Sequence, residues 1–340
     1  MRVVIAGGGL VGLTLARLLN ARDLPATVIE RMPAGTHVPR GFMLGHHGHD
    51  ALRDLGLFDA VRDAGRPIAP QPDGGCAAIA VAVGRVLALL GDGVDMRDRR
   101  AVTALRRGRD GRVTGVVVRG PGGDEPIDAD LVVACDGMGS SVRGLAGIEA
   151  VRSPMEEGKI EWMSPVPVEG AFAMRYLADG GHIGMIGWPE GSFGWRTTRR
   201  VGRDAALAPG LDALVESWAR LLPDAADGVR GLRGMDEVHY TEPELLRCPR
   251  WWVPGAVVIG DAAHFFGPET GASAGIGMAD AHALGQAVAA HPTDPDAACA
   301  AYEAWRGPVA RQAEHLDPGR LRLRGTALPP GRPEEAWPPG

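Results

Sequence analysis

The chain has 340 residues and a formal net charge of −6, and it contains no run of basic residues. This charge balance argues against a nucleic acid as its partner. The length suits one large domain or two closely joined domains with a core that needs no disulfide to be stable. Four cysteines are widely separated and form no C-x-x-C pair, which argues against disulfide and zinc sites and favours a reducing cytoplasm.

The first thirty residues predict a dinucleotide-binding unit. Val3–Ala6 is an apolar run typical of a buried parallel strand, and residues 7–12 read G-G-G-L-V-G, which fits G-x-G-x-x-G. Helix formers continue through Leu19, and Thr27–Ile29 predicts a second strand that ends at Glu30. Strand, glycine turn, helix, strand and terminal acid are the parts of such a unit. The consecutive glycines interrupt the apolar run too early for a signal peptide or a membrane span.

Each glycine of this unit has an expected role. Gly7 permits the tight turn, Gly9 lets the backbone approach a pyrophosphate, and Gly12 lets helix and strand pack closely. The phosphates then lie on the free N–H groups of the first helical turn, which begins with Leu10 and Val11.

Glu30 is placed to accept hydrogen bonds from an adenosine ribose. A carboxylate there favours a ribose with free hydroxyls. FAD or NAD therefore fits better than NADP.

Residues 31–66 predict a loop, a short strand and helices. Arg31 to Pro39 is the loop, Arg40 to Leu44 is the strand, and Asp50 to Leu55 and Leu57 to Asp63 are helical. Three histidines precede the first helix: His46, His47 and His49. They are too tightly spaced on a loop to converge on one ion, so we expect no metal here and favour loop histidines near a ligand.

Residues 67–150 predict mostly strands. We expect a loop over 67–75, a strand over 76–83 and a short helix or turn over 85–90. Strands expected at 94–97, 101–106 and 113–118 suggest an inserted meander. The apolar strand 131–135 then runs into Asp136-Gly137, where Ser140 is suited to cap a following helix.

Residues 151–250 concentrate the aromatic side chains, and we interpret this segment as the substrate region. A hairpin is expected over 183–198, in which strand alternation puts Met185 and Trp188 on opposite faces. Met185, Trp188 and Trp195 are the candidate substrate contacts, although any single aromatic residue is more often simply part of a core.

The last hundred residues predict a buried strand at 256–259 that ends in Gly260-Asp261. Helices are expected over 273–290 and 302–315. The Pro-rich, acidic residues 325–340 are expected to be a disordered tail.

Three separated stretches together resemble one family. The glycine motif with Glu30, the D-G-x-x-S-x-V-R pattern at 136–143, and the G-D-A-A-H run at 260–264 with Pro268, Gly271, Asp280 and Ala281 carry this resemblance. They are similar in order and spacing to the single-component FAD-dependent aromatic hydroxylases of the para-hydroxybenzoate hydroxylase type. Arg40-Gly41 resembles the arginine–glycine stretch that this family places at the flavin edge.

The resemblance implies an α/β fold in which a Rossmann-like FAD-binding domain carries an inserted β-rich substrate domain. The FAD-binding domain is expected to be discontinuous, comprising residues 1–66, 84–150 and 251–324. The substrate domain is expected over 67–83 and 151–250.

The resemblance also implies roles for the later motifs. Asp136 would be shared between FAD and a visiting nicotinamide nucleotide, Gly260 and Asp261 would bind the ribityl or pyrophosphate region, and the helix that follows would aim its N-terminus at the flavin. The expected cofactor contacts of this last region are Gly260, Asp261, Pro268, Gly271, Ala272 and Ser273.

This chain departs from the family pattern at three places. Residues 271–273 read Gly-Ala-Ser where the family often has G-Q-G, and Gly275 and Gly277 replace a common Asn and a common Ala. The segment 85–94 is shorter than the usual helix, which suggests an unusually open flavin or one that a partner covers.

The implied reaction is the hydroxylation of a phenolic or polycyclic aromatic substrate by O2, through a flavin C4a-hydroperoxide, with NAD(P)H as a transient co-substrate. Alternatives on the same scaffold are an epoxidase, a dehydrogenase, or a catalytically silent flavoprotein that acts as a binding partner. No catalytic triad is evident, and His46, His47 and His182 are weak candidates for a base that ionises a phenol. We expect a cytoplasmic monomer or homodimer without a metal, a membrane span or a nucleic acid partner.

Overall fold

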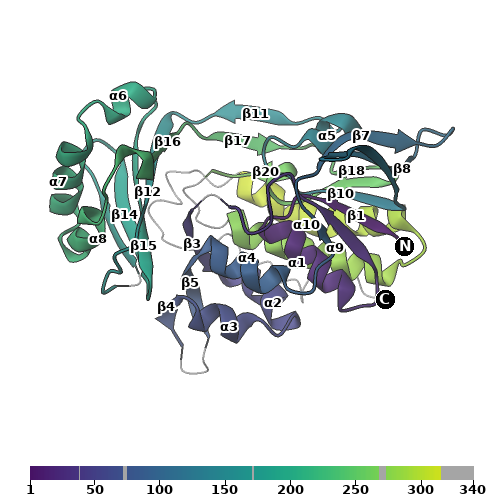
Figure 1. The fold of residues 1–340 in the computed structure, drawn as a ribbon, viewed down its shortest axis with the longest axis horizontal. Coiled ribbons are helices and arrows are strands. Elements are labelled where there is room, and N and C mark those ends of the chain that lie inside the picture. The colour runs from purple at the N-terminus through teal and green to yellow at the C-terminus, as the bar shows by residue number, and fades with distance from the viewer. Residues whose placement is uncertain (38, 72–74, 171, 268–272, 315–340) are drawn as a thin grey trace.

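The computed structural model describes residues 1–37, 39–71, 75–170, 172–267 and 273–314 (Figure 1). The tail expected at 325–340 lies outside the described residues. Among the helices described, none is long and apolar enough to cross a bilayer.

A six-stranded sheet forms the centre of the larger part of the molecule. Its order is β18-β19-β10-β1-β2-β6, and every neighbouring pair is parallel except β18 with β19. The strands are β18 Trp252–Val253, β19 Ala256–Val258, β10 Leu131–Ala134, β1 Val3–Ala6, β2 Ala26–Ile29 and β6 Met96–Arg97. The four strands β1, β2, β10 and β19 are almost entirely buried because layers of structure cover both of their faces.

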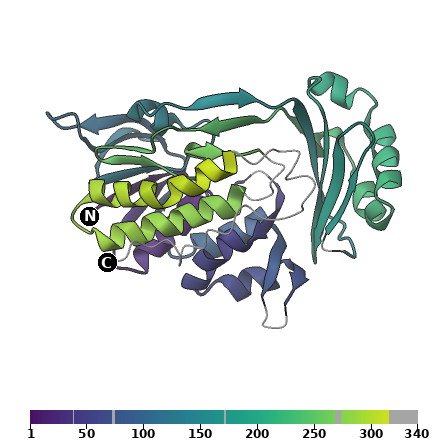
Figure 2. The ribbon, with the colours of Figure 1, turned by 180° about the vertical axis from the view of Figure 1, so that it is seen from behind.

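Long helices cover one face of this parallel sheet. They are α1 Leu10–Asn20, α9 Ser273–Ala290 and α10 Pro295–Glu314, and α9 packs between α1, α10 and the shorter α2 His46–Asp54. Figure 2 shows α9 and α10 lying side by side over the sheet. The last helix begins at Pro295, seven residues before the expected start.

A meander of three strands covers the other face. It consists of β7 Ala101–Arg107, β8 Val113–Gly120 and β9 Gly123–Asp128, of which β9 was not expected. The short helix α5 Ser141–Ala146 packs against β7. The expected strands 101–106 and 113–118 are in the meander, but the strand expected at 94–97 is wrong as part of it, because β6 pairs with β2 at the edge of the parallel sheet.

A second small sheet lies between the parallel sheet and the aromatic-rich segment. Its order is β3-β5-β4, with β3 Gly41–Gly45, β5 Cys76–Ala82 and β4 Arg66–Pro70. Two helices accompany it, α3 Phe58–Asp63 and α4 Val83–Gly91. The expectation of a loop throughout 67–75 is wrong at its start, because residues 66–70 pair with β5 despite their two prolines.

Five strands within residues 157–241 form what we call the distal sheet, whose order is β13-β14-β15-β12-β16 and whose pairs are all antiparallel. Its strands are β13 Phe172–Tyr176, β14 His182–Trp188, β15 Gly191–Arg199, β12 Glu157–Ser164 and β16 Val238–Thr241. The outer face is covered by α6 Arg203–Leu207, α7 Leu211–Leu221, the turn η1 Pro223–Ala225 and α8 Ala226–Arg230, and η2 Met235–Glu237 precedes β16.

Two short paired strands connect the two parts of the molecule. β11 Val151–Pro154 and β17 Glu244–Arg247 pair with each other, and they run along the top of Figure 1 toward the distal sheet. β20 His264–Phe265 pairs with β17 and follows the turn η3 Gly260–Ala262.

The two faces of the distal sheet belong to different cores. Ile183 and Met185 pack with Trp162 and Trp218 on the face that α7 and α8 cover. Ile186 and Trp188 pack with Phe193, Trp195 and Ala80 of β5 on the opposite face, toward the small sheet. The expected alternation of Met185 and Trp188 is confirmed. We call the second face the inner face.

Candidate functional site

The glycine loop after β1 is shaped by close backbone contacts. Gly7 has φ +112°, and a Cβ there would lie 2.4 Å from the carbonyl oxygen of Cys135. A Cβ on Gly12 would lie 2.0 Å from the carbonyl oxygen of Gly7, so the first turn of α1 packs directly on the loop. Gly9 has no neighbour within 4 Å of its Cβ position and leaves the surface open. A tight turn, close helix packing and an open surface at Gly9 together let a pyrophosphate approach the backbone.

The N-terminus of α1 offers the donors. Gly9 is the N-cap and supplies no side chain, and the first intrahelical bond runs from the Leu13 N–H to the Gly9 carbonyl. The N–H groups of Leu10, Val11 and Gly12 therefore have no partner within the helix. Together with the uncovered glycine surface, they fit the phosphates of a dinucleotide.

Glu30 lies across the glycine loop. Its Oε2 accepts a hydrogen bond from the Gly8 N–H at 2.7 Å, and its Oε1 accepts one from the Met32 N–H at 2.7 Å. Each oxygen retains a lone pair for a ribose hydroxyl. The adjacent Arg31, also expected to contact the cofactor, is exposed, and its contact stays a prediction.

Asp136 follows β10 at the same edge of the sheet, but its carboxylate accepts hydrogen bonds from the N-terminus of α5. It accepts hydrogen bonds from the Ser141 N–H at 2.8 Å, from the Val142 N–H at 3.3 Å and from the hydroxyl of Ser140. The Ser140 hydroxyl in turn accepts from the Arg143 N–H at 3.0 Å, which confirms the expected cap. A contact between Asp136 and a cofactor stays a prediction.

The Gly260–Asp261 turn packs against the glycine motif. Gly260 has φ +58°, and a Cβ there would lie 3.2 Å from Cγ2 of Val11. A Cβ on Gly277 would lie 2.6 Å from the same methyl group. Val11 thus fills the space between Gly260 and Gly277, and this packing explains why Gly277 replaces the larger residue of the family pattern. At Gly275, α9 passes close to the start of α2, since a Cβ there would lie 3.3 Å from the Gly48 nitrogen.

Asp261 is a partly buried carboxyl at the end of the parallel sheet. Burial raises its pKa to about 6. The nearby His264 lowers this pKa, and Asp280 raises it further. Arg40 is close enough to lower this pKa slightly. A carboxyl in this position can accept hydrogen bonds from the hydroxyls of a ribityl chain.

A buried ionic network contacts the Gly260–Asp261 turn and stabilises it. Asp280, in the middle of α9, is fully buried, and its Oδ2 accepts from the Gly260 N–H at 3.1 Å. The same oxygen lies 2.7 Å from Nε2 of His264, and Oδ1 accepts from Nε of Arg306 at 2.7 Å. Burial alone would raise the pKa of Asp280, but His264 and Arg306 lower it overall.

Arg143 connects the second motif with the third. Its buried guanidinium donates to the Ala262 carbonyl at 2.9 Å and to the Met138 carbonyl at 2.9 Å. Arg143 and Asp280 lie within the family motifs, but the sequence did not predict these contacts or the part that Arg306 takes in them. The available signal was the single acidic residue, Asp280, in a helix composed mostly of small and apolar residues.

Arg40 contacts the distal sheet. Its Nη2 lies 2.6 Å from Oε2 of Glu161, and Nζ of Lys159 lies 2.7 Å from Oε1 of the same carboxylate. Burial would raise the pKa of Glu161, but the Lys159 and Arg40 cations together lower it. Lys159 and Glu161 were not predicted, although position 159 holds the single lysine of the sequence.

The candidate histidines differ from the expectation. His46, His47 and His49 lie in α2 rather than on a loop, and Nε2 of His49 contacts the Leu44 carbonyl at 3.0 Å. Burial lowers the pKa of His47 to about 4, and burial with the nearby Lys159 lowers that of His182 to about 4. Because a general base works best with a pKa near the working pH, these values argue against His47 and His182 as efficient bases.

The substrate candidates separate into two groups. Trp188 and Trp195 are on the inner face, where a Cβ on Gly41 would lie 2.6 Å from the Trp188 ring. Met185 is fully buried on the other face, and its Sδ would lie 3.0 Å from a Cβ on Gly228 of α8. Met185 is therefore part of a core, and its assignment as a substrate contact is withdrawn.

The start of α9 is described from Ser273, which is partly buried. Pro268, Gly271 and Ala272 lie outside the described residues.

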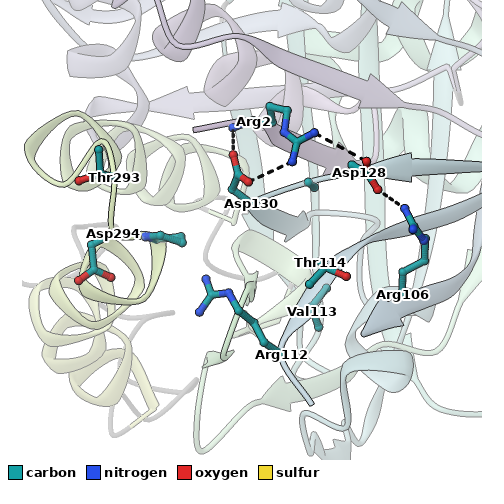
Figure 3. A pocket seen from close by; sticks show the side chains of 11 residues that line it. Arg2, Arg106, Arg112, Val113, Thr114, Asp128, Asp130, Thr293 and Asp294 are labelled. Carbon is teal, nitrogen blue, oxygen red and sulfur yellow. Dashed lines mark hydrogen bonds and ion pairs between the residues drawn. The ribbon is translucent and has the colours of Figure 1, made fainter. Parts of the chain in front are cut away.

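A polar depression lies at the opposite end of the parallel sheet (Figure 3). Arg2, Arg106 and Arg112 line it, and all three are engaged in ion pairs with aspartates, such as Arg2 with Asp130 at 3.3 Å. Ligands of open α/β sheets bind at the carboxyl ends of the strands. This depression lies at the amino ends of β1 and β10, so it is not the cofactor site.

Comparisons with known proteins agree with this geometry. Residues 1–72 and 86–317 match the sequence profile of the family described as FAD binding domain. The aurachin C monooxygenase/isomerase of Stigmatella aurantiaca is 29% identical over 338 residues, which cover 90% of this chain and 85% of that protein. The dialkyldecalin synthase of Streptomyces rugosporus is 30% identical over 319 residues, which cover 85% of this chain and 65% of that protein.

A solved structure shares the fold. The tetrameric form of 2-methyl-3-hydroxypyridine-5-carboxylic acid oxygenase has a TM-score of 0.79 and 21% identity, and the match covers 95% of this chain and 91% of that chain. Its tetrameric form does not match the monomer or homodimer that we expect for this chain, whose subunit number stays a prediction.

The expected α/β fold of the para-hydroxybenzoate hydroxylase type is confirmed. The family match covers most of the chain, and it includes the glycine loop, Asp136 and the Gly260–Asp261 turn. The chain belongs to the FAD-binding-domain family of flavoprotein monooxygenases and is an FAD-dependent oxidoreductase.

Proposed function

We propose that this protein hydroxylates an aromatic substrate, of a phenolic, polycyclic or secondary-metabolite type, with FAD, NAD(P)H and O2. The observation that carries the proposal is the meeting of three features at the carboxyl ends of the parallel strands. These are the glycine loop, the Gly260–Asp261 turn and Arg40, which reaches from there to the aromatic inner face of the distal sheet. The names of similar monooxygenases support it.

The residues of this chain would bind and orient the cofactor. The first-turn amides of α1 would hold the phosphates, Glu30 the adenosine ribose, and Asp261 the ribityl hydroxyls. The N-terminus of α9, which begins at Ser273, would favour negative charge on the flavin ring. When bound, FAD would supply the redox chemistry that links oxidation of NAD(P)H to the transfer of oxygen from O2.

The inner face would position the substrate ring and keep water away from it. Trp188, Phe193 and Trp195 form the apolar core of this face and are 3%, 6% and 8% exposed, so they would act as the wall behind the substrate ring. Glu161, held by Arg40 and Lys159, supplies a fixed polar group at the side of these rings. Water must be excluded because water in the site would uncouple NAD(P)H oxidation from product formation.

The test has two parts. The purified protein should contain FAD rather than FMN, and anaerobic NADH or NADPH should bleach its absorbance near the flavin maximum. A panel of phenolic and polycyclic compounds is then scored by stimulated NAD(P)H oxidation and by product mass. A flavin that stays oxidised under both nucleotides would refute the proposal and favour a silent binding partner.

A second candidate is a reaction on the same scaffold without oxygen insertion. It is favoured by the similarity to a protein named dialkyldecalin synthase, which is not named as an oxygenase. A product that gains no oxygen from labelled O2 would select this candidate. We also propose that the protein is cytoplasmic, since its four cysteines are all free.

A further inference from the structure

Arg40 lies between the cofactor turn and the distal sheet. Its Nη2 lies 2.6 Å from Oε2 of Glu161 on β12, and its charge is close enough to Asp261 to oppose the rise in the pKa of that carboxyl. The Arg40 carbonyl accepts a hydrogen bond from the Val83 N–H at 2.9 Å, which fixes the backbone at the start of α4. The Arg40 side chain is 47% exposed, so part of its guanidinium is accessible to a ligand.

Glu161 is a buried carboxylate that the distal sheet supplies. It lies opposite Trp195 of β15, so its side chain points to the inner face. Lys159 precedes it by two positions on the same strand and therefore points to the same face. The side chains of Glu161 and Lys159 are 7% and 14% exposed, and their charged atoms lie 2.7 Å apart. One buried carboxylate thus binds two cations, and one positive charge of this cluster is left uncompensated.

The three side chains of this cluster differ in their freedom to move. Lys159 and Glu161 are mostly buried in one strand, whereas Arg40 is half exposed and directly precedes β3. An arginine side chain has many rotamers, and a contact that fixes it removes most of them. Without the carboxylate, the cations of Lys159 and Arg40 would repel each other, and Arg40, as the exposed partner, would move away. Glu161 therefore determines where the guanidinium of Arg40 lies.

We propose that Glu161 is a positioning residue, which holds the Arg40 guanidinium at the edge of the bound FAD, so that the distal sheet takes part in cofactor binding. The inference rests on the proposed function, in which FAD binds at the Gly260–Asp261 turn beside Arg40. Glu161 acts through Arg40 and does not itself contact FAD. A guanidinium that is already held in place donates its hydrogen bonds without a further loss of side-chain freedom, and this strengthens FAD binding.

The test measures FAD binding to the FAD-free protein by equilibrium dialysis. Glu161→Gln keeps the shape of the side chain but removes its charge. Because FAD must then order a released arginine, its affinity should fall about two- to tenfold. Glu242→Gln is the matched control, since Glu242 is a partly exposed carboxylate that pairs with Arg200 at 2.9 Å. FAD affinity should be the same in this control as in the parent. An unchanged affinity in Glu161→Gln would overturn the proposal.

A double-mutant cycle separates positioning from a general loss of structure. Arg40→Met should also weaken FAD binding, and adding Glu161→Gln to it should cause no further loss, because Glu161 acts through Arg40. At saturating FAD, the absorption bands of the bound flavin should move in the same direction in both single variants and stay in place in Glu242→Gln. An unchanged FAD affinity in Arg40→Met, or a full additional loss in the double variant, would contradict the proposal. Flavin bands that move in Arg40→Met alone would contradict it as well.

A second background covers the case in which Glu161→Gln does not fold, since it leaves Lys159 buried without its anion. The comparison is then made in Lys159→Met protein, where adding Glu161→Gln leaves no buried lysine unpaired. The same loss of about two- to tenfold is expected there, and equal affinities would overturn the proposal. If NAD(P)H reduces the flavin but Glu161→Gln binds FAD like the parent, the proposed function survives and this inference fails. If Glu161→Gln weakens FAD binding but NAD(P)H never reduces the flavin, this inference survives and the proposed function fails.

Discussion

Replacing Asp280 by Asn removes the negative charge from the network beneath the Gly260–Asp261 turn. In the parent, this fully buried carboxylate is contacted by Arg306, His264 and the Gly260 N–H. The Asn side chain keeps the shape but leaves the buried Arg306 without a counter-charge. Removal of one partner of a buried ion pair costs about 3–5 kcal/mol of the free energy of unfolding.

The expected change in melting temperature follows from the size of the chain. The unfolding entropy is about 2.1 cal/mol/K per residue. For 340 residues, a loss of about 3–5 kcal/mol corresponds to a fall in Tm of about 4–7 °C. Differential scanning calorimetry of the FAD-free protein measures this directly. FAD affinity should fall as well, because the Gly260 N–H loses a charged acceptor.

The control is a partly exposed ion pair that is also formed by an aspartate and an arginine. Asp50 and Arg53 of α2 lie 3.0 Å apart, with side chains 29% and 51% exposed. Exposed pairs contribute about 0–1 kcal/mol. Asp50→Asn should therefore shift Tm by no more than about 1–2 °C. If Asp280→Asn behaves like Asp50→Asn, the network does not stabilise the turn and the reasoning is refuted.

Three further predictions concern the cofactor and the substrate surface. Glu30→Ala should weaken FAD binding at least several-fold in equilibrium dialysis, because the ribose loses a charged acceptor; unchanged affinity would show that Glu30 does not hold the ribose. FAD affinity should rise as pH increases toward 6 and level off above it, because hydroxyl donors favour ionised Asp261, whose pKa is raised to about 6. Asp261→Asn should remove this pH dependence. A pH dependence that persists in this variant would implicate another group. Trp188→Phe should lower product formed per NAD(P)H consumed while Met185→Leu does not, and equal coupling in both would exclude the inner face as the substrate surface.

Local sequence patterns predicted the elements that depend on local chemistry. The unit from Val3 to Glu30 was correct because glycine turns, parallel strands and capped helices each leave a signature within a few residues. The cap at Ser140 was correct for the same reason. The strand at 66–70 was missed because its pairing with β5 outweighs the low strand propensity of its prolines.

Contacts between distant segments could not be predicted in this way. Glu161 meets Arg40 across 121 positions, and Asp280 meets Arg306 across 26, and only the fold brings these residues together. Met185 illustrates the same limit. Alternation correctly separated it from Trp188, but the sequence does not show which face the helices cover.

The departures from the family pattern become intelligible once these distant contacts are included. A side chain at position 277 would collide with Val11, and one at position 275 would approach the backbone of Gly48. In this chain α9 therefore lies against both α1 and α2 through glycines. The same helix carries Asp280, whose contact with the Gly260 N–H fixes the turn. Close helix packing and the ionic network thus act on one element. A substitution such as Gly277→Ala should disturb the cofactor turn through Val11, although position 277 itself contributes no polar group.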